Sequence, residues 1–221
     1  MLSEIFYLRC AECGGPCEGD MPVCAQCLER IEPHEHFCES CGYPSPIPLK
    51  LCGMCSRKGA ADRISIGYRY RGPVKSLLRD IKFNYRISGR HAVGRLIHTD
   101  KFKGYDIVTD VPSHYTRRLR RFRHPAEDMA RHIALETGTQ YKKLLKRIRR
   151  TEYQFRLRKN QRATNVKGAF MCQFDVRGLK ILLVDDIITT GSTVKECSGI
   201  LKKAGASVVD VFALSGGNTN R

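Results

Sequence analysis

Hydrophobic positions alternate between strand-like and helix-like periods along most of the chain. Residues 64–70 (ISIGYRY) have the alternation of a strand, and residues 72–83 place apolar side chains at helical spacing. The run 180–184 (KILLV) is continuously apolar, as is typical of a central parallel strand. We expect further strands at 106–111 and 207–214, and further helices at 93–97, 125–136 and 193–204. This order predicts an α/β domain with a parallel sheet over residues 62–221.

The first 59 residues show little apolar periodicity and are instead rich in cysteine and proline. Eight of the eleven cysteines form four Cys-x-x-Cys pairs, namely Cys10/Cys13, Cys24/Cys27, Cys38/Cys41 and Cys52/Cys55. In a reducing cytosol such pairs are typical of zinc ligands. Because no ordinary core is available in this segment, metal binding must supply the folding energy. We therefore predict a small double zinc-ribbon module over residues 1–59.

The spacing of the cysteines also bears on how they share the metal. Ten residues separate Cys13 from Cys24, and ten residues separate Cys41 from Cys52. This repeat favours sequential pairing, with the first four cysteines on one ion and the last four on another, although an interleaved arrangement stays open. His34 and His36 lie near a knuckle and could replace a ligand, but exposed loop histidines are the favoured interpretation. Four thiolates on each ion leave no open position, so about two structural zinc ions are expected.

The run 181–193 (ILLVDDIITTGST) places two carboxylates at the end of a buried strand, before a Thr/Gly/Ser loop and a helix. A turn at Gly191 lets backbone N–H groups surround a phosphate, and the loop hydroxyls and helix N-terminus add to the attraction. The carboxylates could accept hydrogen bonds from ribose hydroxyls. The alternative is a strand end followed by a helix cap. The whole ordered run favours a ribose-phosphate site made of Asp185, Asp186, Thr189, Thr190, Gly191, Ser192 and Thr193.

This run resembles the ribose-phosphate signature of type I phosphoribosyltransferases. The rest of the chain resembles the ComF family, competence-associated proteins that join a cysteine-rich N-terminal module to such a domain. The resemblance covers nearly the whole chain and includes CESCGYPSPIPLKLCGMC, DVPSHYTRRLRRFRHPAEDMA and YQFRLRKNQRATNVKGAF. Relatives usually carry an RGFNQAE-like run where residues 121–127 read RFRHPAE here, which leaves the roles of Arg123 and His124 open.

The resemblance implies further features of the site. It implies phosphoribosyl pyrophosphate as ligand, Mg²⁺ as its metal, and a hood formed around residues 154–165. It also implies a loop from Asp110 to His114 that contacts pyrophosphate, with Val111, Pro112, Ser113 and His114 as its site residues. Arg117, Arg118 and Arg156 are candidate partners for phosphate oxygens, against the alternative that they are solvated surface arginines.

The net charge of +17 is unevenly distributed. Residues 114–162 carry 16 Lys and Arg against 4 Asp and Glu, whereas residues 1–59 carry 5 against 8. Five aromatic residues are interleaved with the basic ones: Tyr115, Phe122, Tyr141, Tyr153 and Phe155. This pattern favours single-stranded DNA as a partner, with a solvated basic face as the alternative. By the ComF resemblance, the protein acts in DNA uptake, and a ComFA-like DNA translocase is a candidate partner.

An active phosphoribosyltransferase of nucleotide metabolism is the alternative function. Such an enzyme displaces pyrophosphate from the anomeric carbon, but the sequence identifies no acceptor nucleophile. No stretch reaches the roughly 18 apolar residues that cross a bilayer, and the start MLSEIFYLRC lacks the pattern of a signal peptide. We therefore expect a cytoplasmic protein without membrane insertion.

Overall fold

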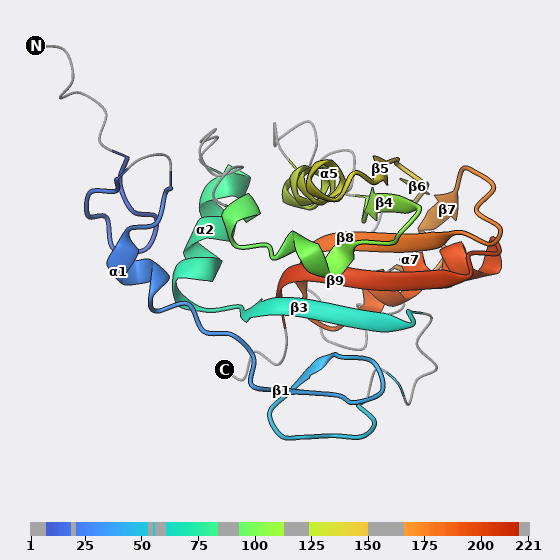
Figure 1. The fold of residues 1–221 in the computed structure, drawn as a ribbon, viewed down its shortest axis with the longest axis horizontal. Helices are drawn as coiled ribbons and strands as arrows, with labels where there is room; N and C mark the ends of the chain where they lie inside the picture. Colours follow the sequence, from blue (N-terminus) through green and yellow to red (C-terminus); the bar gives the residue numbers. More distant parts are fainter. Residues whose placement is uncertain are drawn as a thin grey trace, which may run out of the picture.

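A computed structural model describes residues 8–18, 21–52, 55, 61–83, 93–112, 124–149 and 166–216. Its centre is a parallel five-stranded sheet in the order β3-β9-β8-β4-β5, which Figure 1 shows from β3 upward to β5. The strands are β3 (Arg63–Arg69), β4 (Ile107–Asp110), β5 (Gln140–Tyr141), β8 (Lys180–Ile188) and β9 (Val208–Gly216). The predicted α/β fold with a parallel sheet is confirmed.

Helices cover both faces of the sheet. On one face, α2 (Gly72–Phe83), α5 (Pro125–Thr137) and the 3-10 turn η1 (Thr99–Phe102) pack on Leu182 and Val184 of β8. On the other face, α7 (Ser192–Lys203) packs on Leu183 through Val194 and Cys197. Side chains along a strand alternate between faces, so the continuous apolar run of β8 supplies both cores.

The predicted elements agree with the structure, except that β8 is longer and several short elements were not expected. We expected a strand over 180–184, but β8 continues to Ile188 because its last residues pair with the end of β9. Helical backbone is present at residues 93–95 of the expected helix 93–97. The sequence pattern did not indicate β5, nor the antiparallel pair β6 (Leu145–Arg147) and β7 (Phe170–Cys172), because two or three residues carry no measurable periodicity.

The first part of the N-terminal module lies beside α2 (Figure 1). It contains α1 (Ala25–Leu28), and its side chains Met21 and Val23 belong to the same hydrophobic core as Leu77 of α2. The hydroxyl of Ser76 donates a hydrogen bond to Glu12 at 2.5 Å. Part of the module is therefore stabilised by packing on the second domain as well as by its cysteines.

The second part of the module, with β1 (His36–Phe37) and β2 (Pro44–Ser45), lies along the outer edge of β3 (Figure 1). The N–H of Ile64 donates to the carbonyl of Cys41 at 2.6 Å, and the N–H of Arg69 donates to that of Glu32 at 3.0 Å. Gly42 has φ +75°, and a Cβ there would lie 2.6 Å from the carbonyl oxygen of Ile64. The close approach to β3 therefore requires glycine at this position. The expected division into residues 1–59 and 62–221 stays a prediction.

Within the described residues, none of the helices is both long and apolar enough to cross a membrane.

Candidate functional site

The strand order places a topological switch point between β4 and β8. From β4 the chain passes through α5 to β5 on one side, and from β8 it passes through α7 to β9 on the other. Open α/β sheets bind ligands at such a switch point, outside the carboxyl ends of the strands. Asp110 ends β4, and Asp185 and Asp186 lie in the last part of β8. The fold thus brings three carboxylates to the edge where a ligand is expected.

The loop from Thr189 to Thr193 connects β8 to α7. Gly191 has the left-handed conformation (φ +71°), directly before the first residue of α7. No side chain caps this end of the helix, while the hydroxyls of Thr190 and Ser192 lie 3.0 Å apart. Backbone N–H groups in a first helical turn need partners, and an anion can supply them. The geometry of this loop is therefore suited to a phosphate group.

The neighbouring carboxylates of Asp185 and Asp186 act on each other but differ in their further neighbours. Asp186 forms an ion pair with Lys82 of α2, whereas Asp185 acts electrostatically on Cys197 of α7. Burial raises the pKa of Asp185 well above its ordinary value, and the charge of Asp186 adds to this effect. Burial opposes ionisation of Asp186 too, but Lys82 holds the pKa of Asp186 below its ordinary value. One carboxylate is therefore paired, and the other favours its protonated form.

Asp110 lies on the same face as Asp186 and is buried. Its carboxylate accepts a hydrogen bond from the hydroxyl of Tyr141 at 2.7 Å. His124 is nearby and caps the N-terminus of α5, because its Nδ1 accepts from the N–H of Glu127 at 3.2 Å. Burial lowers the pKa of His124, so the ring is neutral and its 3.8 Å approach to Asp110 is not an ion pair. The cap gives His124 a structural role.

The structure brings together only some of the predicted site residues. The ribose-phosphate set lies together at the end of β8, the loop and the start of α7. Val111 is buried, and it extends the pairing of β4 with β8 because its N–H donates a hydrogen bond to the carbonyl oxygen of Val184 at 2.9 Å. Pro112 directly follows Val111 in the chain. Ser113, His114, Arg117, Arg118, Arg123, Arg156 and the hood at 154–165 lie outside the described residues.

Asp110, which the family resemblance places at the start of the pyrophosphate loop, is the last residue of β4. Other neighbours of the site escaped the sequence analysis. Lys82 and Tyr141 reach the site from a helix and a short strand that no motif marks. Tyr43 comes from the N-terminal module, where its hydroxyl donates to the carbonyl of Thr189 at 3.2 Å. Only the folded chain reveals these contacts.

The eight predicted cysteine ligands form two groups, paired sequentially. One group contains Cys10, Cys13, Cys24 and Cys27, and the other contains Cys38, Cys41, Cys52 and Cys55; within each, all sulfurs lie within 4.8 Å. His34 belongs to neither group, and its ring bonds the carbonyl of Gly216. Sulfur atoms on a tetrahedral zinc ion are about 3.8 Å apart. The measured separations of 3.7 Å for Cys13–Cys24 and 3.5 Å for Cys41–Cys52 fit such an ion.

Backbone donors also favour thiolates in these groups. The N–H of Cys24 points at the sulfur of Cys10 (3.4 Å), and that of Cys52 at the sulfur of Cys38 (3.3 Å). Although burial opposes ionisation, backbone donors lower the pKa of Cys10 to about 6 and that of Cys38 to about 7. Thiolates are the form that binds zinc. The residues present therefore fit two structural zinc sites.

Comparisons with known proteins agree with this architecture. The family described as "Phosphoribosyl transferase domain" matches residues 124–220. The chain is 29% identical over 202 residues to the DNA utilization protein YhgH of Salmonella typhimurium, covering 87% of this chain and 89% of that protein. It is 26% identical over 230 residues to Competence protein F of Haemophilus influenzae, covering 97% and 99%. A solved structure of the allosteric regulatory enzyme of purine biosynthesis is similar, with 25% identity, a TM-score of 0.40, and coverage of 56% of this chain and 25% of that one.

Proposed function

Because the chain is a ComF-family protein with a phosphoribosyltransferase domain, we propose that it binds phosphoribosyl pyrophosphate and single-stranded DNA during DNA uptake. The observation that supports binding of phosphoribosyl pyrophosphate is the geometry of the loop from Thr189 to Thr193. Gly191 opens α7 there without a side-chain cap, at the switch point of the sheet. The 5-phosphate would accept hydrogen bonds from the N–H groups of this turn and from the loop hydroxyls.

The carboxylates of β8 would bind the ribose. Asp185 and Asp186 are the proposed acceptors for its hydroxyls, and Lys82 keeps Asp186 ionised. Mg²⁺ would bind with the pyrophosphate, because oxygen ligands suit this ion. Among the described residues, only the cysteines gather three or more metal-ligand atoms within 4.8 Å. The ligand's own phosphate oxygens would therefore complete the coordination of Mg²⁺.

Calorimetry with phosphoribosyl pyrophosphate tests this site. Gly191→Val places a β-branched side chain at φ +71° in the phosphate cradle, so binding should be lost. Gly178→Val is a matched control, because Gly178 has φ +73° with open space around it. Replacing Asp185 and Asp186 together by Asn should weaken binding, since a hydrogen bond to a charged group contributes about 1.5–3 kcal/mol. Unchanged affinity in the Gly191 variant would show that the loop is not the site.

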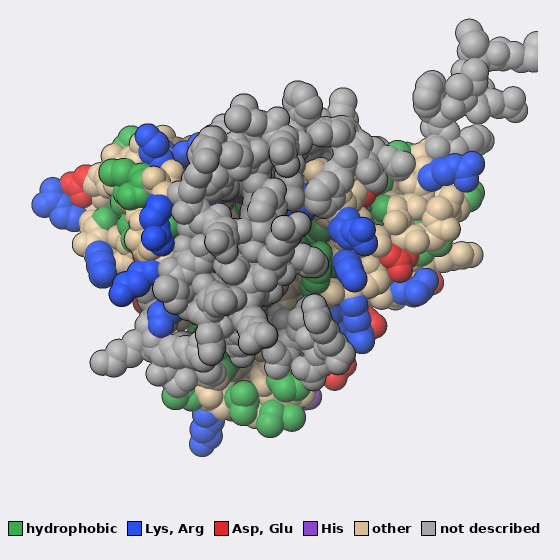
Figure 2. Space-filling model, turned by 180° about the vertical axis from the view of Figure 1, so that it is seen from behind, with side chains coloured by type: hydrophobic (Ala, Val, Ile, Leu, Met, Phe, Trp, Pro, Cys, Tyr) green, Lys and Arg blue, Asp and Glu red, His purple; other side chains and the backbone are tan. Residues whose placement is uncertain are grey.

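A surface on and beside β6 and β7 supports the proposed binding of single-stranded DNA. It combines the basic side chains of Lys142 and Lys146 with the exposed apolar side chains of Ile148, Met171 and Phe174. The ammonium of Lys142 lies 3.8 Å from the ring centre of Phe174. Figure 2 shows Lys and Arg side chains with hydrophobic ones between them at its left edge, the end of the molecule that holds β7. Cations and aromatic rings together bind single strands through phosphates and stacked bases.

The names of the relatives add support for a role with DNA, since one is a DNA utilization protein and another a competence protein. A ComFA-like DNA translocase is a proposed partner on the ground of the family resemblance alone. The alternative function is an active phosphoribosyltransferase, which the domain match favours. Pyrophosphate release from phosphoribosyl pyrophosphate, measured with and without single-stranded DNA, separates a binding protein from an enzyme.

A further inference from the structure

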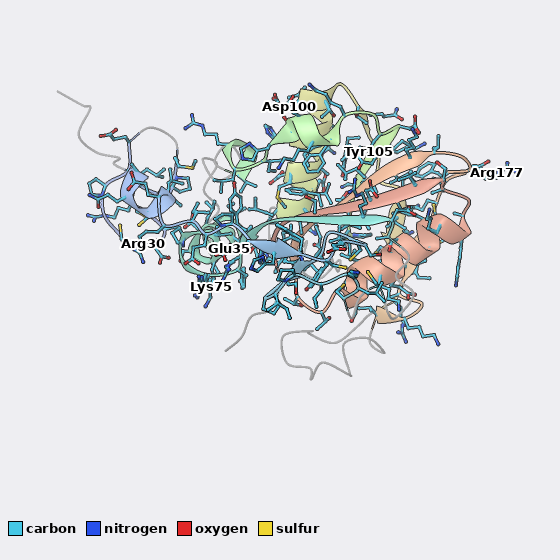
Figure 3. The ribbon with its side chains drawn as sticks, turned by 60° about the horizontal axis from the view of Figure 1, so that its bottom comes forward. Arg30, Glu35, Lys75, Asp100, Tyr105 and Arg177 are labelled. Atoms are coloured by element: carbon cyan, nitrogen blue, oxygen red, sulfur yellow. The ribbon has the colours of Figure 1, made fainter. Side chains whose placement is uncertain are left out.

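A cavity of about 600 Å³ lies beside β3, away from the phosphate loop. The side chains of Arg63 and Ser65 on β3 are exposed there, because η1 covers the neighbouring strand β9 through Phe102 and Phe212 but stops short of β3. Pro33, His34 and Phe37 of the N-terminal module line the opposite side. Figure 3 shows Asp100 and Tyr105 on one side of β3 and Glu35 on the other. The cavity is thus an open pocket lined by both parts of the molecule.

Cations, aromatic rings and a carboxylate line this cavity. Exposed cations are supplied by Arg63 and Lys101, and aromatic rings by Phe37 and Tyr105. Asp210 supplies an acceptor: its Oδ2 accepts a hydrogen bond from the hydroxyl of Tyr105 at 2.7 Å. Its Oδ1 is buried and has no hydrogen-bond partner. A buried carboxylate oxygen without a partner is costly, so a donor from a ligand would be stabilising.

We propose that this cavity binds a nucleotide unit. Aromatic side chains stack with a base, Asp210 Oδ1 accepts from an amino group of that base, and Arg63 and Lys101 bind its phosphate. The volume lies in the roughly 300–1,000 Å³ range of small-molecule sites. A free phosphate would leave the rings and Asp210 unused, and an apolar ligand would leave the cations and Asp210 unused. The combination therefore favours a base that carries a phosphate.

The cavity is separate from the proposed ribose-phosphate site. Arg63, Asp210 and Leu182 are neighbours on β3, β9 and β8, three residues before the level of Asp185. At about 3.3 Å per residue these three residues lie roughly 10 Å toward the amino ends of the strands. The cavity continues along β3 to Tyr68, but none of its lining residues belongs to the ribose-phosphate set. The nucleotide site therefore does not depend on the function proposed for the loop.

Calorimetry on the zinc-loaded full chain with adenosine 5′-monophosphate tests the proposal. The double variant Arg63→Gln/Lys101→Gln should bind about tenfold more weakly, as expected when a charged hydrogen bond is lost. Both side chains are exposed, so the fold should be retained. Lys103→Gln is the matched control, because Lys103 is an exposed lysine next to η1 that does not line the cavity. It should bind as the unchanged protein does.

Purine riboside 5′-monophosphate, which lacks the amino group, tests the role of Asp210. The unchanged protein should prefer adenosine 5′-monophosphate, and Asp210→Asn should reduce this preference. Absence of binding would overturn the proposal. So would binding that is lost in Gly191→Val but retained in Arg63→Gln/Lys101→Gln, since the nucleotide would then occupy the phosphate loop.

A short oligodeoxyadenylate distinguishes two sources of the nucleotide unit. If the oligonucleotide displaces adenosine 5′-monophosphate and is weakened by the same substitutions, the cavity holds one residue of a DNA strand. If it does not displace the mononucleotide, the cavity is a site for free nucleotide. Both results support the proposal and identify its ligand.

Discussion

The hydroxyl of Tyr43 donates a hydrogen bond to the carbonyl oxygen of Thr189, across 3.2 Å. Tyr43 follows the ligand Cys41 by two residues, and Thr189 begins the candidate phosphate loop. The ring of Tyr43 also packs against both the second cysteine group and the core beneath α7. The second cysteine module thus contacts the loop directly.

Tyr43→Phe should weaken the binding of phosphoribosyl pyrophosphate a few-fold while leaving the zinc content unchanged. The variant removes one hydrogen bond, which contributes about 0.5–1.5 kcal/mol, and keeps the ring in place. Calorimetry and metal analysis measure the two effects. Tyr105→Phe is the control. It also removes a hydrogen-bonded hydroxyl, but that hydroxyl donates to Asp210 and not to the loop. An equal loss of affinity in both variants would argue against the contact at Thr189.

Purified protein should contain about two zinc ions per chain, since eight thiolates divide into two four-coordinate groups. Cys38→Ser should reduce this to about one and expose the second ribbon to proteolysis, while residues 62–221 stay folded. Atomic absorption and limited proteolysis measure the outcome. Cys172→Ser, which lies outside both groups, should keep both ions. Loss of the whole fold in Cys38→Ser would show that the two domains are not independent.

Single replacements of the two aspartates of β8 should change stability in opposite directions. Asp186→Asn leaves Lys82 without its partner, so the free energy of unfolding at pH 7 should fall by about 1–3 kcal/mol. Asp185→Asn should raise it, because burial disfavours the ionised carboxylate that the unfolded chain carries at pH 7, whereas Asn is neutral in both states. Thermal unfolding without ligand measures both. A decrease of similar size in both variants would show that their environments do not differ as described.

The same two groups predict a pH dependence. The pKa of Asp185 is raised in the folded protein, so its contribution to stability decreases as the pH rises from 3.8 through the raised value. The pKa of Asp186 is lowered, so its contribution is present above 3.8 and is lost as the pH falls through the lowered value. Asp185→Asn should therefore flatten the decrease of stability above pH 3.8. A titration curve unchanged by this substitution would contradict the assignment.

Binding of single-stranded DNA should weaken steeply with salt, because phosphate contacts release counterions. Replacing the basic cluster by Gln should flatten the slope without affecting the Asp185/Asp186 site; the cluster is Lys142, Lys143, Lys146, Arg147, Arg149 and Arg150. Lys143 pairs with Glu127 at 2.7 Å, so its replacement alone should change the slope less than that of Lys142. Fluorescence anisotropy at several salt concentrations measures this. If residues 1–59 alone bind as well as the full chain, the ribbons are the DNA-binding part.

The sequence was sufficient to predict the elements and motifs that depend on local pattern. The long strands and helices follow from hydrophobic period, and the cysteine groups and the loop at Gly191 follow from spacing. The different environments of Asp185 and Asp186 were not predicted, because they depend on Lys82 of α2 and Cys197 of α7, which no local pattern brings to β8. The contacts of Lys82 and Tyr43 join residues more than 100 positions apart, and no local pattern encodes them.

The bonds that Ile64 and Arg69 of β3 make with the N-terminal module have a consequence for self-association. An edge strand with open N–H and C=O groups is a template on which another copy can add a strand, which leads to aggregation. Here the segment from Glu32 to Cys41 occupies both ends of that edge. Chelation of zinc should uncover it, so the metal-free protein should form β-rich aggregates even where the rest of its sheet is intact.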